Sequence, residues 1–117
     1  KGWLPTEAAA ELLISHRAWL LREDFLQAAI EVWWEPFRDC QVAAIDFAAA
    51  ADAVQGVLPC SDGERQVVLV AASIAEGIPV DLREAALCMD AANAARAAQA
   101  MCHAAGRRVQ VVTEACR

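Results

Sequence analysis

Five cysteines and two histidines are the residues of this chain best suited to nucleophilic or metal chemistry, and their spacing favours neither. A cysteine nucleophile needs an imidazole held beside it, yet the adjacent residues Cys102 and His103 would point about 100° apart on a helix. Metal-binding cysteines usually come in close-spaced pairs, which this sequence lacks. The odd set of cysteines is typical of free thiols in a reducing cytoplasm rather than of a disulfide scaffold: Cys40, Cys60, Cys88, Cys102 and Cys116.

The two histidines have structural interpretations. His16 falls on the apolar side of the first predicted helix, near Leu13 and Leu20, which favours a buried imidazole bonded to a backbone carbonyl. His103 falls near the end of the last predicted helix, where the helix dipole favours a cation. The glycines are dispersed, so the sequence has no phosphate-binding loop. We therefore predict no catalytic residue, no metal ligand and no cofactor, in a protein that is not an enzyme.

The charge of the chain restricts its partners. Its 117 residues carry a formal net charge of −6, which argues against a nucleic-acid partner, because such proteins neutralise phosphates with Lys and Arg. The longest apolar run, from Val67 to Ala75, is about half of the roughly 18 residues that a membrane span needs. We expect a single cytoplasmic domain with a real core and no membrane partner.

Aromatic residues give the best indication of a binding surface. Trp33 and Trp34 are adjacent in a predicted helix from Glu23 to Trp34, so they cannot both face the same core. We assign Trp33 to the core and Trp34 to the polar side, where it either anchors an interface or packs under residues 37–45. Trp3 and Trp19 are expected to fix the first helix to the bundle. The candidate interaction residues are Trp34, Leu69, Trp33, Arg107 and Arg108.

Helix-terminating residues divide the chain into short helices. An N-cap oxygen accepts a bond from a first-turn amide, a Glu three residues later can bond back to the cap amide, and a glycine just past the last turn ends a helix. The predicted caps and ends are Ser61, Glu64, Asp81, Glu84, Gly77 and Gly106, with further N-caps at Thr6, Asp46 and Asp90.

These signals predict an all-α domain, a compact bundle of five or six short helices over residues 1–106. The helices are expected over residues 7–16 (with 17–23 either a continuation or a break), 23–34, 47–55, 62–76, 82–88 and 91–105, with 37–45 irregular and 40–43 briefly extended. The helix from Asp62 to Glu76 is apolar almost all round, which places it at the centre, and Leu69 falls within its narrow polar edge. Residues 107–117 form a tail or strand, because Arg107 to Thr113 alternates as a strand does.

The second half of the chain also resembles a known group of sequences. The resemblance is carried by Ser61, Gly63 and Glu64, by Ala71 to Ser73, by Gly77 to Leu82 and by His103 to Gly106. On these motifs the chain resembles small actinobacterial proteins with no assigned function. The resemblance implies a source and a helical fold, and it implies no activity.

The functional prediction is a non-enzymatic helical protein–protein interaction or regulatory module that associates with itself or with another protein. One alternative is a helix-turn-helix transcriptional regulator, with the turn from Glu76 to Asp81 and a recognition helix from Leu82. That helix offers only Arg83 as a base, against Asp81 and Glu84. Another alternative is a small-ligand-binding or thiol-sensing bundle that uses Cys102 or Cys60.

Overall fold

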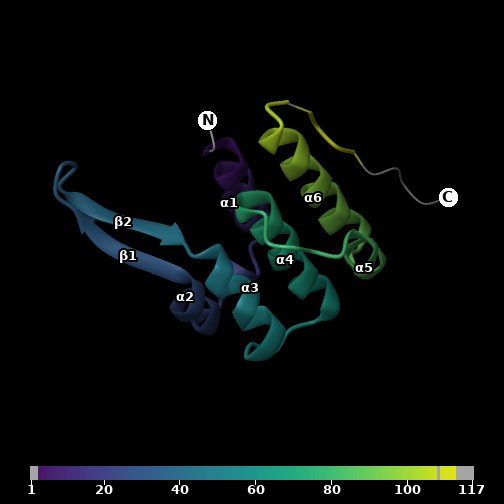
Figure 1. Ribbon diagram of the computed structural model, residues 1–117, viewed down its shortest axis with the longest axis horizontal. Coiled ribbons are helices and arrows are strands. Elements are labelled where there is room, and N and C mark those ends of the chain that lie inside the picture. Colours follow the sequence, from purple (N-terminus) through teal and green to yellow (C-terminus); the bar gives the residue numbers. More distant parts are fainter. Residues whose placement is uncertain (1–2, 108, 113–117) are drawn as a thin grey trace.

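The computed structural model describes residues 3–107 and 109–112 of the chain. Figure 1 shows a group of helices from which a β-hairpin projects to one side. In chain order the elements are α1 (Trp3–His16), a 3₁₀ turn η1 (Trp19–Leu21), α2 (Glu23–Ala29), β1 (Ile30–Glu35), β2 (Cys40–Ile45), α3 (Phe47–Gly56), α4 (Asp62–Glu76), α5 (Leu82–Cys88) and α6 (Ala91–Ala104). The mostly helical fold is confirmed, but the hairpin makes the description all-α imprecise.

The first helix begins before its predicted N-cap, Thr6. It ends at His16, so of the two alternatives predicted for residues 17–23 the structure has the break. Thr6 lies inside α1 rather than at its N-cap, because the helix already begins at Trp3. At the other end Arg17 adopts a left-handed backbone conformation with φ 77°, which stops the helix. The chain then makes the short turn η1 before α2, so residues 17–23 form a break.

The predicted helix from Glu23 to Trp34 is wrong in its second half. Helix α2 ends at Ala29, and β1 pairs antiparallel with β2, with Ile30 opposite Ile45 and Glu35 opposite Cys40. The segment from Ile30 to Trp34 consists largely of β-branched and aromatic residues, which favour a strand. Pairing with residues 40–45 supplies the backbone hydrogen bonds that a helix would otherwise provide, so this segment is extended.

The caps of α3 and α4 are confirmed. The Asp46 carboxylate accepts a hydrogen bond from the Ala49 N–H at 3.0 Å. At α4 the Ser61 hydroxyl accepts from the Glu64 N–H at 3.1 Å, while the Glu64 carboxylate accepts from the Ser61 N–H at 2.9 Å. Gly77 ends α4 with φ 73°, a conformation that glycine adopts without steric cost.

The caps of α5 and α6 are confirmed in part. Asp81 accepts from the N–H groups of Arg83 and Glu84 at 3.0 and 3.2 Å. The expected return bond, from the Asp81 N–H to the Glu84 carboxylate, is not made in the described residues. That carboxylate instead accepts a weak bond from Cys88 Sγ at 3.8 Å. Asp90 caps α6, and Gly106 follows its end with φ 83°. There the N–H groups of Gly106 and Arg107 donate to the last carbonyls of α6, the pattern of a Schellman motif.

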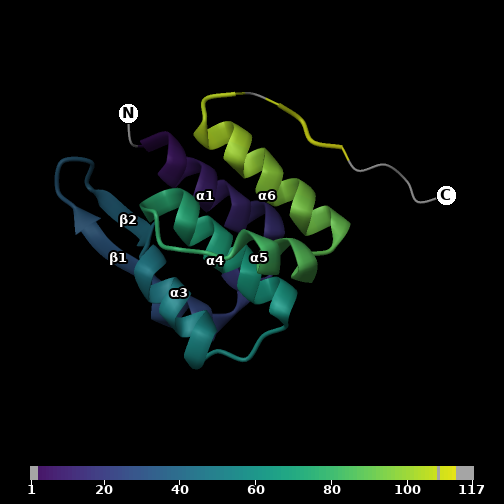
Figure 2. The same ribbon diagram turned by 45° about the vertical axis from the view of Figure 1, so that its right-hand side comes forward.

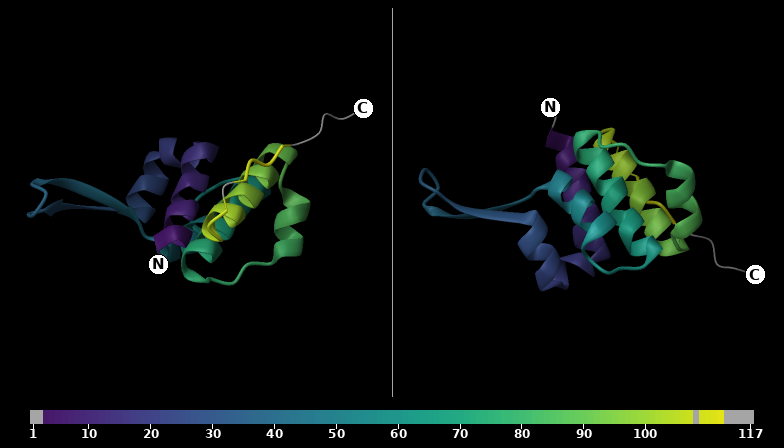
Figure 3. Two further views of the ribbon diagram at one scale, coloured as in Figure 1. Left: turned by 90° about the horizontal axis from the view of Figure 1, so that it is seen from above. Right: turned by 60° about the horizontal axis from the view of Figure 1, so that its bottom comes forward.

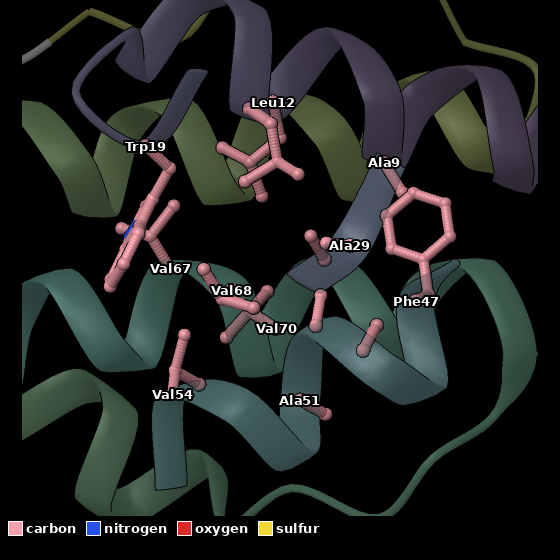
Figure 4. Packing of buried hydrophobic residues seen from close by; sticks show 14 of the residues in the cluster. Ala9, Leu12, Trp19, Ala29, Phe47, Ala51, Val54, Val67, Val68 and Val70 are labelled. Carbon is pink, nitrogen blue, oxygen red and sulfur yellow. The ribbon is translucent and has the colours of Figure 1, made fainter. Parts of the chain in front are cut away.

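Helix α4 lies at the centre of the body, as its sequence predicts. It packs against α1, α3, α5 and α6, and Figure 2 shows α1, α4 and α6 running side by side. Figure 4 shows the close packing at this centre, with Trp19 beside Val67 and Phe47 directed toward Ala9. Leu69, which the sequence places within the polar edge as a candidate interaction residue, is partly buried against the core. The polar edge predicted from the sequence is partly covered by the surrounding helices: Gln66 is buried, Arg65 and Ser73 are half-buried, and Glu76 is exposed.

The tail shows no strand over its described residues. Residues 109–112 have no regular secondary structure, and the Val111 N–H donates to the Gln99 side chain of α6 at 3.3 Å. Arg108 and residues 113–117, which belong to the predicted strand, lie outside the described residues. Among the described helices, none is both long enough and apolar enough to cross a membrane.

Candidate interaction surface

The hairpin, residues 30–45, is called the arm here. Its antiparallel register puts Val32 and Trp34 on one face, opposite Ala43 and Gln41. Trp33 lies on the other face, opposite Val42. Figure 3 shows the arm extending away from the helices in both views. Away from its base, therefore, neither face of the arm packs against a helix of the described residues.

The arm exposes most of its large apolar side chains. The exposed fractions are 56% for Trp34, 45% for Trp33 and 98% for Phe37 in the loop between the strands. The assignment of Trp34 to an exposed position is therefore confirmed, and the assignment of Trp33 to the core is wrong. The error has a simple cause, because in a strand adjacent residues alternate between two faces, and the described part of the chain leaves Trp33 and Trp34 exposed on both.

A groove lies where the base of the arm meets the outer side of α1, and it is called the α1 groove here. It encloses about 680 Å³. Its lining is mostly apolar and includes Trp3, Ala10 and Ile14 of α1 together with Ile30, Ala43 and Ile45 of the arm. Trp3 is 80% exposed, so the expectation that it fixes α1 to the bundle is wrong. Ile30, Ala43 and Ile45 lie on the same face of the arm as Val32 and Trp34, so the α1 groove adjoins that face.

A second, more polar hollow of about 500 Å³ lies between α1 and α6, beside the described part of the tail. Its lining includes Glu11, Arg96, Gln99, His103 and Arg107. Arg107, a predicted interaction residue, therefore lies at this hollow and is exposed. Arg107 is far from the arm in the sequence and lines a different hollow from the one at the base of the arm, so the structure does not gather the predicted interaction residues at one site.

At the edge of this hollow, side chains from α1 and α6 form a cluster that the sequence interpretation did not identify. His103 Nε2 lies 3.6 Å from Glu7 Oε1, and His103 Nδ1 lies 3.6 Å from Glu11 Oε1. One donor atom from each residue lies within 4.8 Å of the others, and an imidazole with two carboxylates is a set that divalent first-row metals accept. A protonated His103 would instead pair with both carboxylates. The i, i+4 spacing of the two Glu is visible in the sequence, but nothing there links them to His103.

The imidazole of His16 is not bonded as expected. Its Nδ1 is buried without a hydrogen-bond partner among the described residues. Burial, with the Arg96 guanidinium as the next cause, lowers the pKa of His16 below its ordinary value of 6.5, although Glu64 and Asp90 act in the opposite direction. The folded chain thus favours the neutral form of this side chain.

His16 should make folding stability depend on pH. As the pH falls below 6.5, His16 becomes protonated in the unfolded chain more readily than in the folded chain, because its pKa is lower in the folded chain. The free energy of unfolding should therefore fall as the pH drops from 6.5 toward the lowered pKa, and this group should have no effect above that range. Urea unfolding on both sides of pH 6.5 measures the effect. The variant His16→Gln should show a smaller loss on acidification, and an unchanged loss would exclude His16 as a cause.

The described cysteines Cys40, Cys60, Cys88 and Cys102 are free thiols, and Cys116 lies outside the described residues. Desolvation, reinforced by the carboxylates of Glu84 and Asp62, raises the pKa of the Cys88 thiol. A raised pKa lowers the thiolate fraction, which is the reactive form.

Cys88 should consequently be alkylated more slowly than Cys40, the exposed cysteine of the arm. The thiolate fraction falls about tenfold for each unit by which the pKa rises. Alkylation near neutral pH, followed by peptide mass spectrometry, gives both rates in one sample. Equal rates would show that Glu84 and Asp62 do not hold back ionisation of Cys88.

Comparison of the chain with protein-family models, with curated proteins and with solved structures finds no match.

Proposed function

We propose that this chain is a non-enzymatic protein–protein interaction module that associates with a second copy of itself through the arm. The observation that supports this most directly is the exposure of Trp33, Trp34 and Phe37 on a hairpin that projects from the helices. Tryptophan is enriched among the residues that dominate binding energy at interfaces, because it buries a large area on contact.

The architecture of the arm adds a second reason. An isolated two-stranded hairpin is marginally stable in water, and this one lacks a third strand within the described residues. Both outer edges leave strand N–H and C=O groups without a sheet partner, which makes them sites for pairing with another chain. Covering the arm would remove its apolar side chains from water and stabilise its paired conformation.

Light scattering over a concentration series tests this function. We expect the mass of the unaltered chain to rise from that of a monomer toward twice that value. The double variant Trp34→Ser, Phe37→Ser should remain monomeric while its circular dichroism is unchanged, because neither side chain contributes to the buried core. All samples need a reductant, since the exposed Cys40 could otherwise form an artificial cross-link.

Leu87→Ser is a matched control, because Leu87 is also a large exposed apolar residue but lies on α5. This variant should associate as the unaltered chain does. Loss of association in both variants would indicate nonspecific apolar contact. A monomeric chain at every concentration would contradict self-association, and the arm would then have to bind a different protein.

A further inference from the structure

The α1 groove is large and apolar enough to receive the tip of an arm, and every copy of the chain has both parts. We propose that the arm of each copy lies in the α1 groove of the other, in a reciprocal exchange across a two-fold axis. This inference rests on the proposed function, and it adds the surface that receives the arm.

The position of the α1 groove makes the exchange geometrically consistent. The groove is at the base of the arm, and a strand of six residues spans about 20 Å. A two-fold axis through the middle of the arms would run them antiparallel, with the tip of each at the base of the other. Phe37 at one tip would then meet Trp3 and Ile14 of the second copy. A two-fold contact of this kind uses the same surface on both copies, so it closes at a dimer.

The exposed area agrees with this arrangement. An aromatic side chain offers about 150–250 Å², so the exposed fractions of Trp3, Trp34 and Phe37 amount to roughly 350–590 Å² of aromatic surface per copy. Ile14 and Val32, 59% and 56% exposed, add to this. A stable interface buries about 800 Å² per partner. Contact between the arms alone would leave out Trp3 and Ile14, whereas the exchange includes them.

The charge of the chain gives the association a distinctive response to salt. Each copy carries a net charge of −6, so two copies repel each other, and salt screens that repulsion. Apolar contact between copies should therefore tighten as the salt concentration rises. Tighter association at low salt would point instead to an interface made by ion pairs, and would overturn the exchange.

A mixing experiment tests the exchange. Phe37→Ser alters the tip of the arm, and Ile14→Glu places a charge in the α1 groove on a residue that is exposed in one copy. We expect each variant alone to dimerise at least tenfold more weakly than the unaltered chain. In an equal mixture, the intact arm of the Ile14→Glu chain can enter the intact groove of the Phe37→Ser chain. The mixture should therefore form heterodimers more readily than either variant forms homodimers, which native mass spectrometry resolves once one variant carries an isotope label.

The outcomes separate this inference from the proposed function. If Ile14→Glu dimerises as the unaltered chain does while Phe37→Ser does not, the arm associates but the α1 groove does not receive it, and the exchange is wrong. If both variants are weakened and mixing restores nothing, reciprocal insertion is also wrong. If the unaltered chain never dimerises, the proposed self-association itself fails. Urea unfolding of each variant shows whether a weakened chain is still folded.

Discussion

Replacing Trp19 with alanine is expected to lower the free energy of unfolding by about 3–5 kcal/mol, the range for truncating a large buried aromatic side chain. Trp19 is 1% exposed, and its ring centroid lies 5.0 Å from that of Phe25. Its indole N–H donates to the Glu64 carbonyl at 2.9 Å, and the Arg22 guanidinium lies 4.7 Å from its ring centroid. One side chain thus connects η1 to α2 and α4, and its removal leaves a cavity bounded by all three.

Two further variants separate the contributions to this effect. Trp19→Phe keeps an aromatic ring but loses the bond to Glu64, and should cost less than Trp19→Ala. About 0.5–1.5 kcal/mol is attributable to the lost hydrogen bond, because the Glu64 carbonyl keeps its acceptor role within α4. Trp3→Ala removes the same residue type from an exposed position and should change stability by less than about 0.5 kcal/mol. Urea unfolding at concentrations where the chain is monomeric gives all three values. Similar losses for Trp3→Ala and Trp19→Ala would contradict the central role of Trp19.

Replacing Gly63 with alanine should destabilise the protein, although the same change inside a helix usually stabilises by about 1 kcal/mol. A Cβ atom at position 63 would lie 2.9 Å from the Cys88 carbonyl oxygen. That oxygen belongs to the backbone at the end of α5, so relief of the clash requires α5 to move relative to α4. Forcing extra volume into a packed contact typically costs about 1–3 kcal/mol, and the urea midpoint should fall accordingly.

Gly56 provides the matched control. It lies at the end of α3, and a Cβ atom there would have no neighbour within 4 Å. Gly56→Ala should therefore leave stability unchanged or raise it by up to about 1 kcal/mol. If both variants shift the urea midpoint in the same direction, the close approach of α5 to Gly63 does not determine the effect.

Helix boundaries were predictable where the deciding interaction is local. The Ser61–Glu64 capping box and the Asp90 cap each involve residues three positions apart, so their residue types and spacing are enough to locate a helix start. The central place of α4 was also predictable, because an almost continuous apolar run needs neighbours on every side. Whether Leu69 is exposed could not be decided from the sequence, because it depends on the other helices that pack around α4 and leave Leu69 half-buried.

The arm was not predictable from local pattern. From Phe25 to Trp33 the apolar residues fit a helical period, and the first part of that segment is helical. Whether Ile30 continues the helix depends on residues 40–45, which provide the second strand. Helix propensity at one position is a weak preference that such longer-range pairing overrides.

The candidate surfaces were predictable only in part. Trp34 was identified because two adjacent tryptophans cannot share one face, and this reasoning holds for a strand as well as for a helix. The α1 groove joins Ile14 to Ala43, and the cluster on α1 and α6 joins Glu7 to His103. Such pairs are far apart in the chain, and only tertiary packing brings them together.

Because the arm is closed at its base, its length and sequence can vary with little effect on the helices. The Asp46 N–H donates to the Ala29 carbonyl at 2.7 Å, so the chain leaves the helical body and returns to it at one point. The entropy of closing such a loop grows only with the logarithm of its length. Lengthening, shortening or exchanging the segment between these two residues should therefore change the folding of the helices little. Insertions between these two residues can therefore change what the arm binds without requiring any change in the core.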